Sequence, residues 1–224
     1  MNFHIGDSVR VKAGVRDPDD PNFDIGGWQG RVTDLSHANE PQEPTIGLAW
    51  DSLTLKIMPK QSIERCAREG LNWAETYLYP DELESARPRD SQKDVDRVRE
   101  EIQARVVWLG IGPEGDHIQE VVNSAKSRRA RDILAAWRAE LERTLRFPFE
   151  AIVDEFQDRG PFRADDRVTV LRFHQVADEV YGILVICRKV QMLYEFPLSD
   201  LAAHDKKSPN ADAIQDYRVW HANR

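Results

Sequence analysis

The first ninety residues alternate apolar and polar side chains, the period expected of half-buried strands. In residues 8–12 the valines at positions 9 and 11 are separated by polar residues, and residues 31–35 repeat the pattern. The same criterion predicts two further strands, at 45–51 and 53–57. Proline-rich residues 41–44 predict a loop, and a short helix over 60–70 ends at Gly70, a residue suited to a left-handed cap.

The period changes after the polar break at residues 87–93. Val95, Val98, Ile102 and Val106 follow the spacing of one face of a helix that begins near Ser91. Two further helices are predicted over 116–125 and 128–145, and Pro148 stops the second of these. Strand character then returns in four segments, which are 151–156, 167–171, 181–186 and 192–196.

This order predicts an α+β protein of two small SH3-like antiparallel β barrels joined by a helical segment. The expected domains are residues 1–88, a helical connector over 89–126, and residues 127–224 with a helix and the second barrel. Residues 7–11 (DSVRV) and 166–170 (DRVTV) echo each other, and each is followed by a strand that opens with glycine. This opening resembles SH3-like modules of the KOW type, which is a likeness of fold and does not give a function.

Charge and composition exclude several classes of protein. The 224 residues carry 39 acidic and 31 basic side chains, a net charge of −8 that disfavours a general nucleic-acid binder. Two cysteines are too few for a disulfide scaffold or a four-cysteine zinc site. No apolar run approaches the ~20 residues that span a bilayer. We therefore expect a cytoplasmic protein with no membrane partner.

Enzyme motifs are weak or absent. Residues 110–115 (GIGPEG) match G-x-G-x-x-G, but the preceding residues continue a helical stripe, so we interpret this segment as a turn between helices. There is no G-x-S-x-G elbow, and Cys66 and Cys187 lie among apolar residues where an inert buried thiol is expected. The six histidines show no metal-protease spacing. The sequence predicts no enzyme.

Acidic clusters are the remaining candidate chemistry, because Ca²⁺ prefers six to eight hard oxygen ligands. The densest cluster is at residues 17–24, where two prolines stiffen a segment with four carboxylates. Smaller groups occur at 154–158, 165–166, 178–179 and 200–205. None fits the EF-hand pattern, and most surface acidic runs serve solvation, turns and helix caps.

The C-terminal ninety residues carry three phrases in a fixed order: F-P-F-E-A at 147–151, F-P-L-S-D-L at 196–201 and Y-R-V-W-H-A-N at 217–223. As an ordered set, they resemble the small cyanobacterial calcium-binding protein family. The resemblance implies a small β-rich module that holds Ca²⁺ by surface carboxylates. The positions that it transfers to this sequence are Glu150, Asp178, Glu179 and Asp200, with Asp154 as a weaker addition.

We therefore expect a non-enzymatic calcium-binding protein, with Ca²⁺ as its ion. The alternative is an adaptor in which tandem KOW-like barrels bind a protein, or RNA, through one barrel face. The aromatic residues that would form such a face also suit a barrel core; they are Trp28, Trp50, Trp73, Tyr77 and Tyr79. The basic cluster at residues 126–131 is interpreted as the solvated start of a helix.

Overall fold

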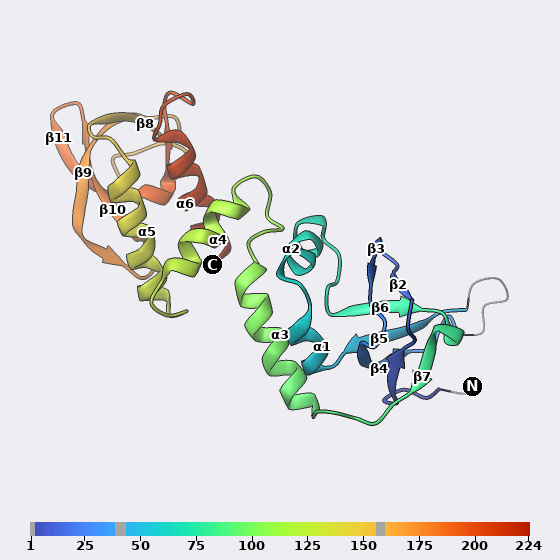
Figure 1. Cartoon of the computed structure of the whole chain (residues 1–224). Helices are drawn as coiled ribbons and strands as arrows, with labels where there is room; N and C mark the ends of the chain where they lie inside the picture. Colours follow the sequence, from blue (N-terminus) through green and yellow to red (C-terminus); the bar gives the residue numbers. More distant parts are fainter. Residues whose placement is uncertain (1–2, 39–43, 156–159) are drawn as a thin grey trace. The chain divides into compact units, whose positions relative to one another are not determined.

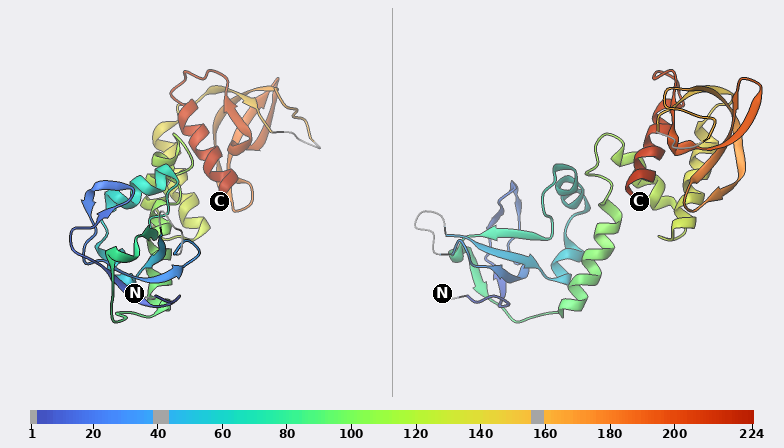
Figure 2. Two further views of the ribbon diagram at one scale, coloured as in Figure 1. Left: turned by 90° about the vertical axis from the view of Figure 1, so that its right-hand side faces the viewer. Right: turned by 180° about the vertical axis from the view of Figure 1, so that it is seen from behind.

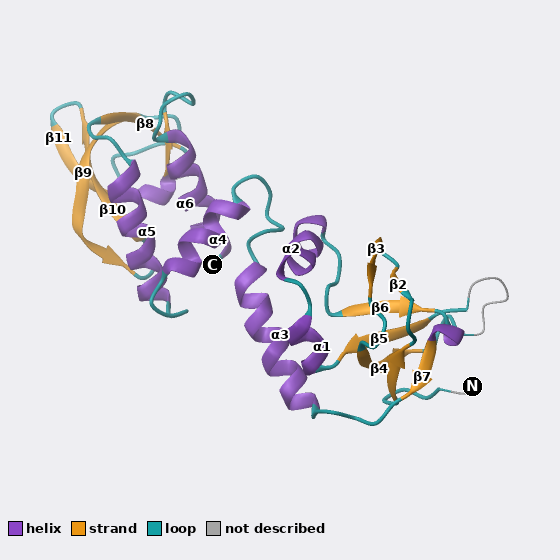
Figure 3. Ribbon diagram, in the orientation of Figure 1, coloured by secondary structure: helices purple, strands orange, loops and turns teal. Residues whose placement is uncertain are grey.

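A computed structural model describes residues 3–38, 44–155 and 160–224. The chain divides into two compact units, unit 1 (Met1–Gly110) and unit 2 (Ile111–Arg224). Both units contain helices and an antiparallel sheet (Figure 3), so the α+β class predicted from the sequence is confirmed. The predicted loop at 41–44 and the end of the predicted strand 151–156 lie partly outside the described residues.

Unit 1 is built on a five-stranded antiparallel sheet in the order β6-β5-β4-β1-β7 (Figure 1). Its strands are β1 (Ser8–Val11), β4 (Gln29–Asp34), β5 (Ile46–Trp50), β6 (Glu75–Leu78) and β7 (Leu83–Ser85). A separate ribbon pairs β2 (Arg16–Asp17) with β3 (Asp20–Asp24). The helices are α1 (Ser52–Ile57), α2 (Lys60–Glu69), η1 (Pro80–Glu82) and α3 (Gln92–Val106). Val9, Val11 and Val32 point into the core as their alternation predicts.

The prediction of a strand over 53–57 is wrong, because these residues form helix α1. Asp51 caps the helix: its carboxylate accepts a hydrogen bond of 2.8 Å from the Thr54 amide. The helix buries Leu55 and Thr54, while Leu53 is 41% exposed and Ile57 is 68% exposed. An alternating run of five residues is too short to distinguish the two periods, and the local cap decides the outcome.

Helix α3 belongs to unit 1. Its Val95 and Val98 are buried in the core of that unit. Asp90, just before the helix, accepts hydrogen bonds of 2.5 Å from the Ser52 amide and from Arg31 Nη2. The chain divides after Gly110, so the predicted connector over 89–126 is shared between the two units. Whether residues 1–88 and 127–224 fold as separate domains stays a prediction.

Unit 2 combines three long helices with a second five-stranded sheet in the order β11-β10-β9-β8-β12 (Figure 2). The helices are α4 (Gly115–Ser124), α5 (Ala130–Thr144) and α6 (Ala211–Asn223), with the short η2 (Leu198–Asp200). The strands are β8 (Phe149–Val153), β9 (Arg167–Asp178), β10 (Gly182–Lys189), β11 (Met192–Pro197) and β12 (Leu201–Ala203). Residues 110–115 connect helix α3 to helix α4, as the sequence predicts.

Aromatic side chains from α5 and α6 form the centre of unit 2. Trp137, Tyr217 and Trp220 are almost fully buried, and their ring centroids are 5.6 to 5.8 Å apart. The Tyr217 hydroxyl accepts a hydrogen bond of 2.7 Å from the Ile183 amide and so attaches α6 to the start of β10. Gly182 makes this approach possible, since a Cβ there would lie 2.2 Å from the Tyr217 hydroxyl.

The closed barrels expected from the sequence are not seen. Both sheets have a linear strand order, with β6 and β7 at the edges of one and β11 and β12 at the edges of the other. Over the described residues, no pairing joins the two edges of either sheet. Three-residue strands at one edge, β7 and β12, offer few backbone groups for closure, and the SH3-like description stays a prediction.

Within the described ranges, no helix is both long enough and apolar enough to cross a bilayer.

Candidate metal site

The five residues predicted as metal ligands lie at three places in unit 2. Asp154 and Asp200 meet at one end of β8, beside α6. Glu150 lies in the same strand but near its other end. Asp178 is the last residue of β9, and Glu179 begins the turn to β10. The structure therefore brings one pair of predicted ligands together and separates the others from it.

Backbone pairing places Asp154 beside Asp200. The Asp154 amide donates a hydrogen bond of 2.9 Å to the Asp200 carbonyl, which continues the pairing of β8 with β12 past the end of β8. The Asp200 carboxylate accepts a hydrogen bond of 3.0 Å from the Ser199 hydroxyl. The Asp154 carboxylate is paired with the Arg218 guanidinium from α6. The carboxylates of Asp154 and Asp200 therefore belong to two residues that are paired directly through their backbones.

A cavity of about 510 Å³ opens beside this pair, against the C-terminal half of α6. Its lining includes two carboxylates, Glu155 and Asp200, and two basic side chains, Arg218 and His221. Burial, followed by the nearby Arg224 charge, lowers the pKa of His221, so this imidazole is neutral near pH 7. Arg218 is therefore the cation that faces the carboxylates.

Asp178 has a structural task in its turn. One of its carboxylate oxygens accepts hydrogen bonds from the amides of Val180 (2.7 Å) and Tyr181 (2.8 Å). The bond from Tyr181, followed by that from Val180, lowers the pKa of the Asp178 carboxyl. The neighbouring Glu179 carbonyl accepts a hydrogen bond of 2.8 Å from Arg224. The bond from Arg224 fixes the turn to the end of α6.

Glu150 and Asp154 are too far apart to share one ion. The two residues lie on the outward-facing side of β8 and of its extension. They are four residues apart, and four residues of extended chain span about 13 Å. Calcium–oxygen bonds are about 2.3–2.6 Å long. Within the part of the chain that the structure describes, no group of three or more His, Cys, Asp or Glu side chains is arranged to hold a metal ion. An ion at any one of these places would need carbonyl or water oxygens to complete its shell.

The acidic cluster at residues 17–24 is a hairpin in the structure, not an irregular loop. Asp17, Asp20 and Asp24 each accept a hydrogen bond from the amide two residues further on, at 2.8, 3.2 and 2.7 Å. These are the local turns that aspartate side chains favour. Burial raises the pKa of the Asp17 carboxyl. The carboxylates of this cluster shape the β2–β3 ribbon.

The aromatic residues proposed as a contact face of unit 1 separate into two groups. Trp50 and Trp73 are buried, and Trp28 packs edge-on against Trp50 with centroids 5.2 Å apart. Tyr77 and Tyr79 are exposed, and the Tyr77 hydroxyl donates a hydrogen bond of 3.1 Å to Asp34. The tryptophans therefore serve the core. An adaptor role for unit 1 stays a prediction.

Sequence reasoning missed a cluster formed by His117, Glu140 and Asp216. The imidazole Nδ1 is 2.5 Å from an Asp216 oxygen, and Nε2 is 3.3 Å from a Glu140 oxygen. Each residue comes from a different helix of unit 2, and they are 23 and 99 positions apart in the sequence. No local pattern marks such a contact. Only the spacing of apolar residues at 213, 214, 217 and 220 could have revealed α6 itself.

Both cysteines lie where their environment suppresses thiolate formation. Cys187 is fully buried in β10, and burial raises the pKa of its thiol to about 12. Cys66 is half-buried, and burial raises the pKa of its thiol as well. The expectation of inert thiols is consistent with these surroundings.

Comparison with known proteins connects unit 2 to one family. Residues 117–221, just under half of the chain, match the family model Calci_bind_CcbP, described as calcium binding. This match confirms the resemblance of the C-terminal part to the calcium-binding family that the sequence phrases indicate. The family is described by a bound ion and not by a reaction. The class of protein that unit 2 resembles is therefore a small calcium-binding protein.

Two solved structures are similar to the chain. CcbP from Anabaena is 20% identical, with a TM-score of 0.40, and the match covers 48% of this chain and 90% of that one. A calcium-binding protein in its calcium-binding form is 21% identical, with a TM-score of 0.38, over 49% of this chain and 90% of that one. No curated protein matches the chain.

Proposed function

We propose that unit 2 binds Ca²⁺ through surface carboxylates and has no catalytic role. The observation that carries this proposal is the family match over residues 117–221, which covers every helix and strand of unit 2 at least in part. The ion is held, in this proposal, at the end of β8, where Asp154 and Asp200 are adjacent. The separate positions at Glu150 and at the Asp178–Glu179 turn are candidates for weaker, water-rich sites.

The chemistry at the end of β8 suits a hard cation. Asp200 and Glu155 line one cavity, and Asp154 lies one residue from Glu155. Carboxylates, backbone carbonyls and water are the oxygen ligands that Ca²⁺ takes. Like charges held close together repel each other, and a divalent cation relieves this repulsion. Because Ca²⁺ would bind the folded unit, it stabilises that unit by ~2.7 kcal/mol at a hundredfold excess over Kd.

Calcium titration of the full chain by isothermal calorimetry tests this proposal. We expect heat of binding for the unaltered protein, and a Kd on the order of tenfold weaker for Asp200→Asn, because one ligand charge is lost. Asp20→Asn is the matched control: it removes the charge of a partly buried aspartate of the β2–β3 ribbon and should leave the Kd unchanged. Absence of binding in the unaltered protein, or equal losses in both variants, would contradict the proposal.

Arg218 provides a second test with the opposite sign. Its guanidinium pairs with Asp154 and also donates a hydrogen bond of 3.1 Å to the Ser199 carbonyl. A cation at this position competes with Ca²⁺ for Asp154, so Arg218→Gln should tighten calcium binding if Asp154 is a ligand. Weaker binding or no change in the calorimetric Kd would remove Asp154 from the ligand set and leave Asp200 to be judged by its own variant.

A further inference from the structure

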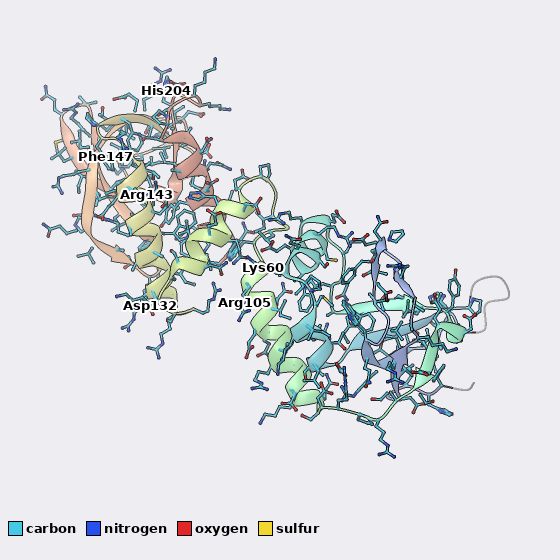
Figure 4. All side chains as sticks on the ribbon, viewed as in Figure 1. Lys60, Arg105, Asp132, Arg143, Phe147 and His204 are labelled. Carbon is cyan, nitrogen blue, oxygen red and sulfur yellow. The ribbon has the colours of Figure 1, made fainter. Side chains whose placement is uncertain are left out.

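The three helices of unit 2 meet at one titratable cluster. His117 extends from α4, Glu140 from α5 and Asp216 from α6. Figure 4 labels Arg143, which lies on α5 one turn beyond Glu140. Asp216 is only 8% exposed, so its carboxylate has little water to replace a lost partner. The imidazole lies between two carboxylates and makes a hydrogen bond to each of them.

The number of N–H groups on the imidazole decides whether both bonds are made. A protonated imidazole carries two donors, one for each carboxylate. A neutral imidazole carries one donor and one lone pair, so one carboxylate must then face an acceptor. We propose that His117 is a proton-operated latch that holds α4 against α5 and α6 when it is protonated and releases one of these two contacts when it is neutral.

The surrounding charges favour the protonated form. Burial lowers the pKa of His117, but Asp216 and then Glu140 together raise it by more, so the resulting pKa lies above the ordinary value. On α5, Arg143 donates hydrogen bonds of 2.7 and 3.0 Å to Glu140 and so fixes the position of that carboxylate. This leaves Asp216 as the strongest partner of the imidazole, at the shorter distance.

Further titratable groups lie around the cluster. Glu114 and Asp212 lie close enough to raise the pKa of the Asp216 carboxyl, an effect added to that of burial. Glu120, one turn along α4, lines the same cavity of about 620 Å³ as His117 and Glu140. Lys126, Asp132 and Arg143 also line this cavity.

The direction of the pH effect follows from the raised pKa. A group whose pKa is higher in the folded state stabilises that state fully below its unfolded pKa, and this contribution is lost as pH rises through the folded pKa. The contact between α4 and its neighbours therefore weakens as the pH rises above about 6.5. The raised pKa of His117 gives the slope its sign above pH 6.5.

Hydrogen exchange of the full chain tests the latch. Mass spectrometry of peptides from α4, corrected for the intrinsic pH dependence of exchange, should show protection that falls as pH rises from about 6 to about 9. His117→Gln should lower the protection and remove its pH dependence. His174→Gln is the matched control, because His174 pairs with Glu195 at 3.4 Å on the sheet and lies outside the cluster. It should behave as the unaltered protein does.

A measurement without any variant of the cluster's histidine supports or overturns the same proposal. The NMR titration of the His117 ring should give a pKa above 6.5, and Asp216→Asn should lower it, because burial then acts with less opposition. A ring that titrates at or below 6.5 in the unaltered protein would overturn the latch. So would α4 protection that is independent of pH, or a pH dependence that survives in His117→Gln. The latch does not depend on calcium binding, and these outcomes are read without the ion.

Discussion

Asn210 joins the end of α5 to the start of α6, and its loss should be costly. The side-chain oxygen accepts a hydrogen bond of 2.9 Å from the Arg146 amide, and the side-chain nitrogen donates one of 2.9 Å to the Arg146 carbonyl. Asn210 is 2% exposed, so water cannot readily take over either bond. Asn210→Ala leaves both backbone groups of Arg146 without a partner. The expected cost to the free energy of unfolding of unit 2 is about 2–4 kcal/mol.

Urea unfolding followed by the NMR signals of unit 2 measures this cost separately from unit 1. Asn210→Asp is the informative companion, because it keeps an acceptor for the Arg146 amide but loses the donor to the Arg146 carbonyl. We expect it to destabilise unit 2 as well. Asn223→Ala is the control: it removes one exposed hydrogen bond of 2.7 Å to the Val219 carbonyl. If Asn210→Ala cost no more than this control, the two-bond reasoning would be refuted.

Two further predictions concern buried contacts. Arg89→Gln removes the guanidinium that donates two hydrogen bonds of 2.8 Å to the buried carboxylate of Asp51. In urea unfolding, this change should lower the free energy of unfolding of unit 1 by about 2–4 kcal/mol. The control Arg87→Gln, at an exposed arginine, should lower it by less than about 0.5 kcal/mol. Gly182→Ala adds a Cβ 2.2 Å from the Tyr217 hydroxyl at a φ of 72°, and should lower the melting temperature of unit 2 by more than any surface substitution; an unchanged melting temperature would contradict the packing of α6 on β10.

Strong periodicity made most helices predictable. Leu134, Trp137 and Leu141 recur at helical spacing and are the buried face of α5, as expected. The strand error at 53–57 shows the limit of the same method, because five residues do not separate a period of 2 from one of 3.6 and a capping aspartate decided between them. Whether the sheets close into barrels could not be predicted for a different reason. The edges of a sheet are set by long-range pairing, which alternation within a strand does not encode.

The candidate site was only partly predictable. The ordered phrases of the C-terminal part indicated the calcium-binding family, and the family match over 117–221 bears this out. The spatial relation of the ligands was not available from the sequence, since the contact between Asp154 and Asp200 spans 46 positions and depends on the pairing of β8 with β12. The same holds for His117, whose two carboxylate partners come from other helices, 23 and 99 positions further along the chain.

Net charge was a weaker guide to the calcium site than the ordered sequence phrases were. The first ninety residues are the more acidic part, yet their aspartates cap turns of the β2–β3 ribbon. In unit 2, several carboxylates are already paired with arginines, as Asp154 is with Arg218. The proposed binding of Ca²⁺ there therefore depends on where oxygen atoms are placed and not on the net charge of the segment.

Calcium titration of the ¹⁵N-labelled full chain, followed by NMR, tests the central claim most directly. We expect the amide signals of Asp154, Glu155 and Asp200 to shift in a saturable way with Ca²⁺, and those of the acidic β2–β3 ribbon to stay in place at the same ionic strength. Shifts confined to the ribbon, or shifts across the whole chain that sodium chloride reproduces, would contradict a calcium site in unit 2.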